Sequence, residues 1–137
     1  MFKRILIPVD FTAKNRRALR LAVDMARQGR AAITLLHVIE RIELLPDAEL
    51  GGFYRKLEGQ ARRHLAAMAD ALAKRGCHVR QSILRGSRVA EIAKSAAGMD
   101  LVLLASHRVG RRRLSRGWDT LSYRVAILAP CPVLLVK

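Results

Sequence analysis

Hydrophobic residues in this chain gather in short runs, and stretches of helical periodicity separate one run from the next. The run at 99–105 is nearly unbroken, as expected of a strand that is covered on both faces, and further strands are predicted at 3–9, 31–39 and 133–136. A weaker run at 78–84 includes Arg80, Gln81 and Ser82, and these polar residues predict a strand at the edge of a sheet.

Apolar residues between the runs recur every three or four positions, which predicts amphipathic helices. We expect one helix from Thr12, as its N-cap, to about Gln28, and a long one over 48–74. Gly51 and Gly52 leave open whether this long helix is ordered from Ala48 or only from about Phe53. Two shorter helices are expected between Ser87 and Gly98 and around 121–128.

The resulting order, β-α-β-α-β-α-β-α-β, determines the expected fold class. Strands that alternate with helices at this spacing predict an α/β fold with a parallel sheet, and right-handed crossovers place helices on both of its faces. We therefore expect a single doubly wound domain over residues 1–137, long enough to bury a core of its own.

Charge is the unusual feature of the composition, since 26 Lys and Arg residues against 11 Asp and Glu residues give a formal net charge of +15. This balance favours polyanionic partners, although many of the arginines fall on predicted solvent faces of helices. With one Trp, 2 Tyr and 3 Phe residues, the chain has no aromatic ladder for stacking single-stranded bases. It also has no helix-turn-helix, RNP or zinc-finger spacing, so no specific DNA recognition is predicted.

Neither a membrane span nor a secretion signal is predicted. The apolar run near the N-terminus ends at Pro8 and Asp10 after about five residues, short of the roughly 7–15 of a signal sequence. No apolar stretch approaches the roughly 20 residues that span a bilayer, so we expect a cytoplasmic protein. Cys77 and Cys131 have neither metal-ligand nor redox spacing, and we expect both to be reduced.

Candidate binding residues follow from the predicted sheet, because ligands of open parallel sheets bind beyond the carboxyl ends of the strands. Those ends carry residues 8–10 after the first strand, 38–40 after the second and 105–107 after the fourth. Asp10 is the only carboxylate directly behind the first strand, and it suits hydrogen bonds from a ribose hydroxyl. A local role in the turn before the first helix is an equally good interpretation of Asp10, and both stay open.

An arginine-rich segment at 106–117 follows the fourth predicted strand and leads toward the last helix. We expect the charged end of any ligand here, held by arginine side chains and by the amides of 119–121 at a helix N-terminus. The residues that give the segment this character are Arg108, Gly110, Arg111, Arg112, Arg113, Arg116 and Gly117.

No catalytic residue and no metal ligand is predicted. Ser106 and His107 are sequence neighbours at a strand end, a poor geometry for a nucleophile and its base, and no GxSxG motif occurs. His37 is expected to be a satisfied core or dimer-side histidine, and His64 and His78 to lie on the surface. No cluster of carboxylates and histidines indicates a metal ion.

Five short segments, taken in order, make the chain resemble the universal stress protein domain over essentially its whole length: KRILIPVD (3–10), LLHV (35–38), GSRVAEI (86–92), DLVLLASH (100–107) and APCPVLLVK (129–137). The resemblance implies a five-stranded parallel sheet in the order 3-2-1-4-5, of the adenine-nucleotide alpha-hydrolase-like type. It also implies a homodimer with a stress-linked regulatory role and no established catalysis.

One branch of that family binds ATP through a loop of the form G-x2-G-x9-G-S/T after the fourth strand, and this chain departs from it. Ala105 and Arg108 occupy the first two glycine positions, and Asp119 occupies the third. Thr120 stands in the Ser/Thr place, while Gly110 is present but off register. Since glycines let backbone amides approach phosphates closely, the departures predict that arginine side chains would have to hold the phosphates instead.

The adenosine end of the family's site is better preserved in this chain. The resemblance implies that Asp10 contacts the ribose and that Pro8, Val9, Val38 and Leu104 line the adenine. ATP, with magnesium, is therefore the cofactor to test. The full set of predicted contacts is Pro8, Val9, Asp10, Val38, Leu104, Ala105, Arg108, Gly110 and Thr120.

Three hypotheses about function follow. The first is a homodimeric universal stress protein, a regulatory binding module whose ATP-binding loop is degenerate. The second is an ATP-binding member that acts as a nucleotide sensor or a slow ATPase. The third is electrostatic binding of nucleic acid or of a membrane surface through the arginine-rich segment and the face formed by Arg16, Arg17 and Arg20.

Overall fold

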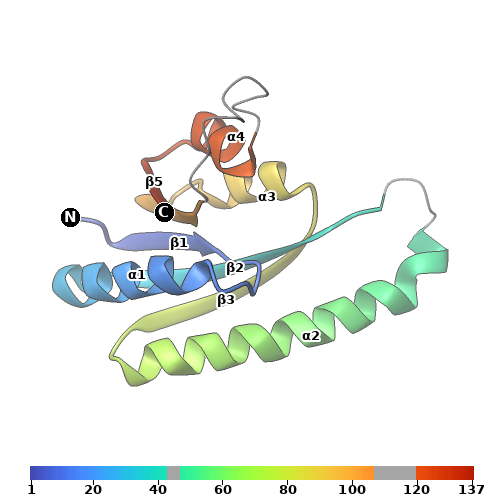
Figure 1. Ribbon diagram of the computed structural model, residues 1–137, viewed down its shortest axis with the longest axis horizontal. Helices are drawn as coiled ribbons and strands as arrows, with labels where there is room; N and C mark the ends of the chain where they lie inside the picture. The colour runs from blue at the N-terminus through green and yellow to red at the C-terminus, as the bar shows by residue number, and fades with distance from the viewer. Residues whose placement is uncertain (43–46, 107–119) are drawn as a thin grey trace.

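The computed structural model describes residues 1–42, 47–106 and 120–137, and its described strands form a five-stranded sheet (Figure 1). The strand order is β3-β2-β1-β4-β5, and every neighbouring pair is parallel. This confirms the predicted fold class and places β3 at one edge and β5 at the other. The strands are β1 (Arg4–Pro8), β2 (Ala32–Glu40), β3 (His78–Gly86), β4 (Leu101–Ala105) and β5 (Val133–Val136).

Four helices cover the two faces of the sheet in the described part of the chain: α1 (Asn15–Gly29), α2 (Asp47–Lys74), α3 (Arg88–Ser95) and α4 (Leu121–Leu128). α1 and α2 lie on one face, and α3 and α4 lie on the other (Figure 1). Successive side chains of a strand point to opposite faces, so Ile5 and Ile7 pack with α1 and α2 whereas Leu6 packs with α3 and α4. Central strands are thus buried on both sides, which is why their sequences read as unbroken apolar runs.

α1 begins at Asn15 rather than directly after Thr12, and the side chain of Asp10 explains the difference. Lys14 is the N-cap and makes no side-chain capping bond, whereas the Thr12 hydroxyl donates a hydrogen bond to Asp10 Oδ1 at 2.6 Å. The Thr12 amide donates to the same oxygen at 3.0 Å, which closes an Asx-type turn ahead of the helix.

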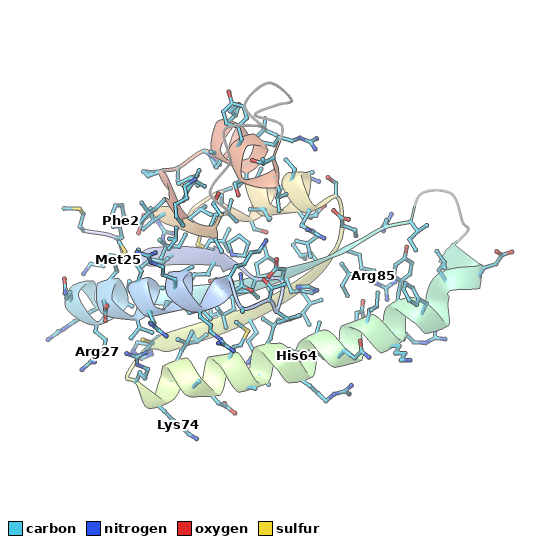
Figure 2. The ribbon with its side chains drawn as sticks, in the orientation of Figure 1. Phe2, Met25, Arg27, His64, Lys74 and Arg85 are labelled. Atoms are coloured by element: carbon cyan, nitrogen blue, oxygen red, sulfur yellow. The ribbon has the colours of Figure 1, made fainter. Side chains whose placement is uncertain are left out.

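α2 runs without interruption from Asp47 to Lys74, so the start near Ala48 is confirmed and Gly51 and Gly52 lie within the helix. Each glycine costs about 1 kcal/mol relative to Ala in a helix. Tyr54 offsets this cost, because its side chain is buried and its hydroxyl oxygen accepts a hydrogen bond from the Ile42 amide at 2.9 Å. The guanidinium of Arg85, which is labelled in Figure 2, lies 5.0 Å from the centre of the Tyr54 ring.

α3 and β4 are both shorter than the sequence predicted. α3 ends at Ser95 instead of near Gly98, and β4 begins at Leu101 instead of Met99. Gly98 has a φ of 78°, which glycine adopts readily and which ends the helical path. The Asp100 carboxylate then accepts hydrogen bonds from the amides of Lys3 and Arg4, which fixes the entry into β4 beside β1.

Among the described helices, none combines the length and the apolar character that crossing a membrane requires. Cys77 and Cys131 are both free, as expected, and burial raises the pKa of the Cys131 thiol.

Candidate functional site

A cavity of about 130 Å³ opens at the carboxyl ends of β1, β2 and β4, where the order of the strands reverses. Its walls bring together six of the residues that were predicted as ligand contacts: Pro8, Val9, Asp10, Val38, Leu104 and Ala105. The cavity is completed by Lys14 just before α1, Asn15 of α1, Arg88 and Ile92 of α3, Leu121 of α4 and His37 of β2. Residues that are far apart in the sequence therefore meet at the carboxyl ends of the strands, where an open α/β fold binds ligands.

Asp10 is the carboxylate of this cavity, and its local contacts determine its charge. Its Oδ1 accepts both hydrogen bonds from Thr12, and its Oδ2 forms an ion pair with Lys14 Nζ at 2.9 Å. Partial burial raises the pKa of Asp10, but the hydrogen bonds from Lys14 and Thr12 outweigh it and leave the pKa below its ordinary value. Asp10 is thus ionised at neutral pH, and each carboxylate oxygen has two lone pairs, so Oδ2 retains an acceptor position beside Lys14.

The turn that carries Asp10 is held from two sides. Asn15 is almost fully buried, with 3% of its surface exposed, and its Oδ1 accepts a hydrogen bond from the Asp10 amide at 3.1 Å. On the other side, His37 Nδ1 lies 2.8 Å from the Val9 carbonyl oxygen. Because that oxygen can only accept, His37 donates from Nδ1, and Nε2 is the acceptor of the neutral ring. Between these anchors, Phe11 adopts a φ of 62°, an uncommon conformation for a residue with a side chain.

A second cavity, of about 390 Å³, adjoins the first along β2 and α2. Both cavities are lined by His37, Val38 and Arg88, so they share a wall. The Phe11 ring lies between two imidazoles, with its centre 4.4 Å from that of His37 and 4.8 Å from that of His64. Glu40 lines the second cavity only, and its Oε1 lies 3.4 Å from Arg88 Nε. The second cavity therefore offers flat apolar surfaces with a cation and a carboxylate at its boundary.

The start of α4 forms another part of the rim. Thr120 is the N-cap, and its hydroxyl oxygen accepts a hydrogen bond from the Tyr123 amide at 3.2 Å. Leu121, the first residue of α4, lines the first cavity. The predicted contacts at Arg108 and Gly110 lie outside the described residues, as do all of residues 107–119.

Sequence reasoning missed several residues of the cavity, and the missed residues had different signals. Asn15 is a polar residue on the same helical face as Ala18 and Ala22, and this break in an apolar stripe was a usable signal. Lys14 and Arg88 sit at helix starts after strand ends, where only the folded structure shows that they turn toward one cavity. His37 was expected in the core or at a dimer contact, but it is half-buried and lines both cavities.

Within the described residues, no three His, Cys, Asp or Glu side chains form a group that would hold a metal ion, and every buried side-chain nitrogen or oxygen has a partner. The cavity thus offers one ionised carboxylate, two cations and apolar walls. These groups suit the binding of a ligand that has hydroxyl donors, a flat apolar part and negative charge.

Comparison with known protein families gives one match over the whole chain. The model of the universal stress protein family matches residues 1–137. The universal stress protein encoded in the QAH/OAS sulfhydrylase 3' region of Thermus aquaticus is 30% identical over 141 residues, an alignment that covers 100% of both chains.

Solved structures agree with this result. The hypothetical protein MJ0577 has 28% sequence identity and a TM-score of 0.84, with 100% of this chain and 96% of that chain covered. The universal stress protein of Archaeoglobus fulgidus in complex with dAMP has 18% identity and a TM-score of 0.69, with coverage of 99% and 98%. At that identity the second likeness supports the fold alone.

Proposed function

Since the chain belongs to the universal stress protein family, we propose that it is a regulatory module that binds an adenine nucleotide at the carboxyl ends of β1, β2 and β4. The observation that carries the proposal is that six predicted contacts from three strands converge on one cavity, with Asp10 among them. A member of the same fold was solved with dAMP, so this architecture admits a purine nucleotide in at least one relative.

The sugar would bind at Asp10, because its ionised carboxylate accepts hydrogen bonds from hydroxyl groups. The base would lie against the apolar walls formed by Val38 and Leu104. A volume of about 130 Å³ is smaller than the roughly 300–1,000 Å³ of typical ligand sites. The adjoining cavity of about 390 Å³ is within that range, so the nucleotide would extend across the shared wall.

Phosphate binding would depend on side chains rather than on a glycine-rich backbone. Lys14 Nζ carries three N–H donors and uses one toward Asp10, which leaves donors for an anion. Arg88 lies on the shared wall and is paired to Glu40 only at 3.4 Å. Arg108, Gly110 and Thr120 remain predictions for the phosphate end, and so does a requirement for magnesium with ATP.

We further propose that the module binds without catalysing a reaction, and that it forms a homodimer through β5 and α4. Among the described strands β5 is a sheet edge, with no described strand on its outer side, and Leu134 on it is 40% exposed. On α4, Ile127 and Leu128 are exposed as well, at 61% and 59%. A two-fold contact would cover these side chains with their own copies and pair the strand edge. Leu134→Glu is therefore expected to give a monomer in analytical ultracentrifugation, and an unchanged dimer would contradict this assignment.

Calorimetric titration of AMP and ATP, each with and without magnesium, tests the site. Asp10→Asn retains an oxygen for the Thr12 hydrogen bonds but removes the charge. Hydrogen bonds to a charged group contribute about 1.5–3 kcal/mol, so the affinity should fall about 10- to 100-fold. Asp24→Asn is the matched control, because it removes one exposed negative charge from the outer side of α1 and should leave the affinity unchanged.

Two results would contradict the proposal. Equal affinity in the wild type and in Asp10→Asn would show that the Asp10 carboxylate does not contact the nucleotide. Absence of nucleotide binding by the wild type would show that the ligand is not a nucleotide. Release of phosphate from ATP in the same samples would show that the protein is a slow ATPase and not only a binding module.

A further inference from the structure

Among the described residues, the exposed cations on the outer sides of α1 and α2 form no ion pair with a side-chain carboxylate, whereas five cations elsewhere do. The ion pairs of the described residues join Arg4 to Asp100, Lys14 to Asp10, Arg85 to Glu58, Arg88 to Glu40 and Lys94 to Glu91. None of these pairs includes an exposed cation on α1 or on the outer side of α2. We call the following exposed residues the basic face: Arg16, Arg20 and Arg27 of α1, Arg55, Lys56, Arg62, Arg63 and Lys74 of α2, and Arg75 directly after α2.

Helical spacing arranges these residues in rows. Lys56, Arg63 and Lys74 are separated by two and three helical turns, so they share the side of α2 opposite to its buried residues. At a rise of 1.5 Å per residue, this row extends over about 27 Å. Lys74 projects from α2 away from the sheet (Figure 2). Arg16, Arg20 and Arg27 form a similar row along one flank of α1.

We propose that the basic face binds the phosphate backbone of a nucleic acid duplex. A row of unpaired cations on one layer repels itself, and a polyanion relieves that repulsion by bringing phosphates into contact and releasing counterions. Most of the cations are arginines, whose planar guanidinium groups pair with phosphate through two hydrogen bonds. Three exposed acids of these helices, Asp24, Glu49 and Asp70, are outnumbered by the nine cations of the basic face.

The exposed side chains of the two helices favour a duplex over a single strand. Base stacking requires exposed aromatic rings, and within the described part of α1 and α2 the only exposed one is Phe53, near the start of α2. The same helices expose no large aliphatic side chain that would insert into a bilayer. A duplex needs neither, because its backbone is bound by charge alone and without sequence preference.

The proposal does not depend on nucleotide binding at Asp10, since it uses a different surface. The arginine-rich segment is an alternative surface for polyanion binding. It carries Arg111, Arg112 and Arg113. Three charges can be removed from each surface, so one experiment compares the two at equal net charge.

Fluorescence anisotropy with a mixed-sequence DNA duplex of about 25 base pairs measures binding over a range of salt concentrations. The slope of log K against log salt is about −0.9 for each phosphate contacted. Replacing Lys56, Arg63 and Lys74 with Gln should therefore make the slope shallower by about 3 and weaken binding at least tenfold at low salt. Replacing Arg111, Arg112 and Arg113 with Gln removes the same charge and should change the slope by less than about 1. Thermal unfolding of both variants checks that they fold.

Several outcomes would overturn the proposal. Equal losses in the two variants would indicate a response to net charge alone, and a loss confined to the second variant would assign binding to the arginine-rich segment. Tighter binding to a single strand of the same sequence would contradict the choice of a duplex. Binding to phosphatidylserine vesicles without binding to the duplex would show that the partner of the basic face is an acidic membrane surface and not a nucleic acid.

Discussion

Asn15 is the buried side chain whose removal tests the structure of the site most sharply. Its Oδ1 accepts the Asp10 amide at 3.1 Å, and 3% of its surface is exposed. Asn15→Ala removes the acceptor and leaves a partly buried N–H group without a partner, which costs about 1–3 kcal/mol. Ala is a better helix former than Asn by up to about 0.7 kcal/mol, so the net loss of unfolding free energy should be about 1–2 kcal/mol.

Urea unfolding followed by circular dichroism measures this loss directly. Gln28→Ala is the control, because Gln28 lies near the other end of the same helix and is exposed. A surface substitution of this kind should change the free energy of unfolding by no more than about 0.5 kcal/mol. If Asn15→Ala were as stable as the control variant, the Asp10 turn would not depend on Asn15, and the rigid turn that we describe would be wrong.

Two further predictions concern α2 and the charge of Asp10. Tyr54→Phe keeps the ring but removes the acceptor of the Ile42 amide, so it should lower the free energy of unfolding by about 1 kcal/mol; an unchanged urea midpoint would show that Tyr54 acts through packing alone. The folded-state pKa of Asp10 lies below its ordinary value of 3.8, so its contribution to stability is present above that value and is lost as the pH falls through the folded pKa. The stability difference between the wild type and Asp10→Asn should thus be constant from pH 7 to about 5 and shrink below about 4; a difference that grows on acidification would contradict the ion pair with Lys14.

Much of the fold could be predicted because the buried positions of the strands are occupied by apolar residues. β4 is buried at every position, so its sequence is apolar at every position, and strand-helix alternation then leaves few topologies. The predicted start of α1 was too early, because Asp10 accepts hydrogen bonds from the amide and the hydroxyl of Thr12 and closes a turn ahead of the helix. Gly51 and Gly52 left the start of α2 open between Ala48 and Phe53, and the helix includes both glycines because the tertiary contacts of Tyr54 outweigh their low helix propensity.

The candidate site was predictable to the extent that it consists of strand ends. Pro8, Val38 and Ala105 were identified by their position at the end of a parallel strand, and Leu104 only through the family resemblance; the structure brings all four together. Lys14 and Arg88 could not be identified in this way, because their approach depends on where each helix starts and how it packs on the sheet. Both interpretations of Asp10 remain, since it closes the local turn with Thr12 and lines the cavity.

The chemical shifts of backbone amides on titration with AMP test the central claim most directly. If an adenine nucleotide binds where β1, β2 and β4 end, the largest changes should fall on Val9, Asp10, Val38 and Ala105, and Asp10→Asn should diminish them. Changes that cluster instead on the basic face, or that persist undiminished in Asp10→Asn, would show that the nucleotide is attracted by charge and that the strand ends are not its site.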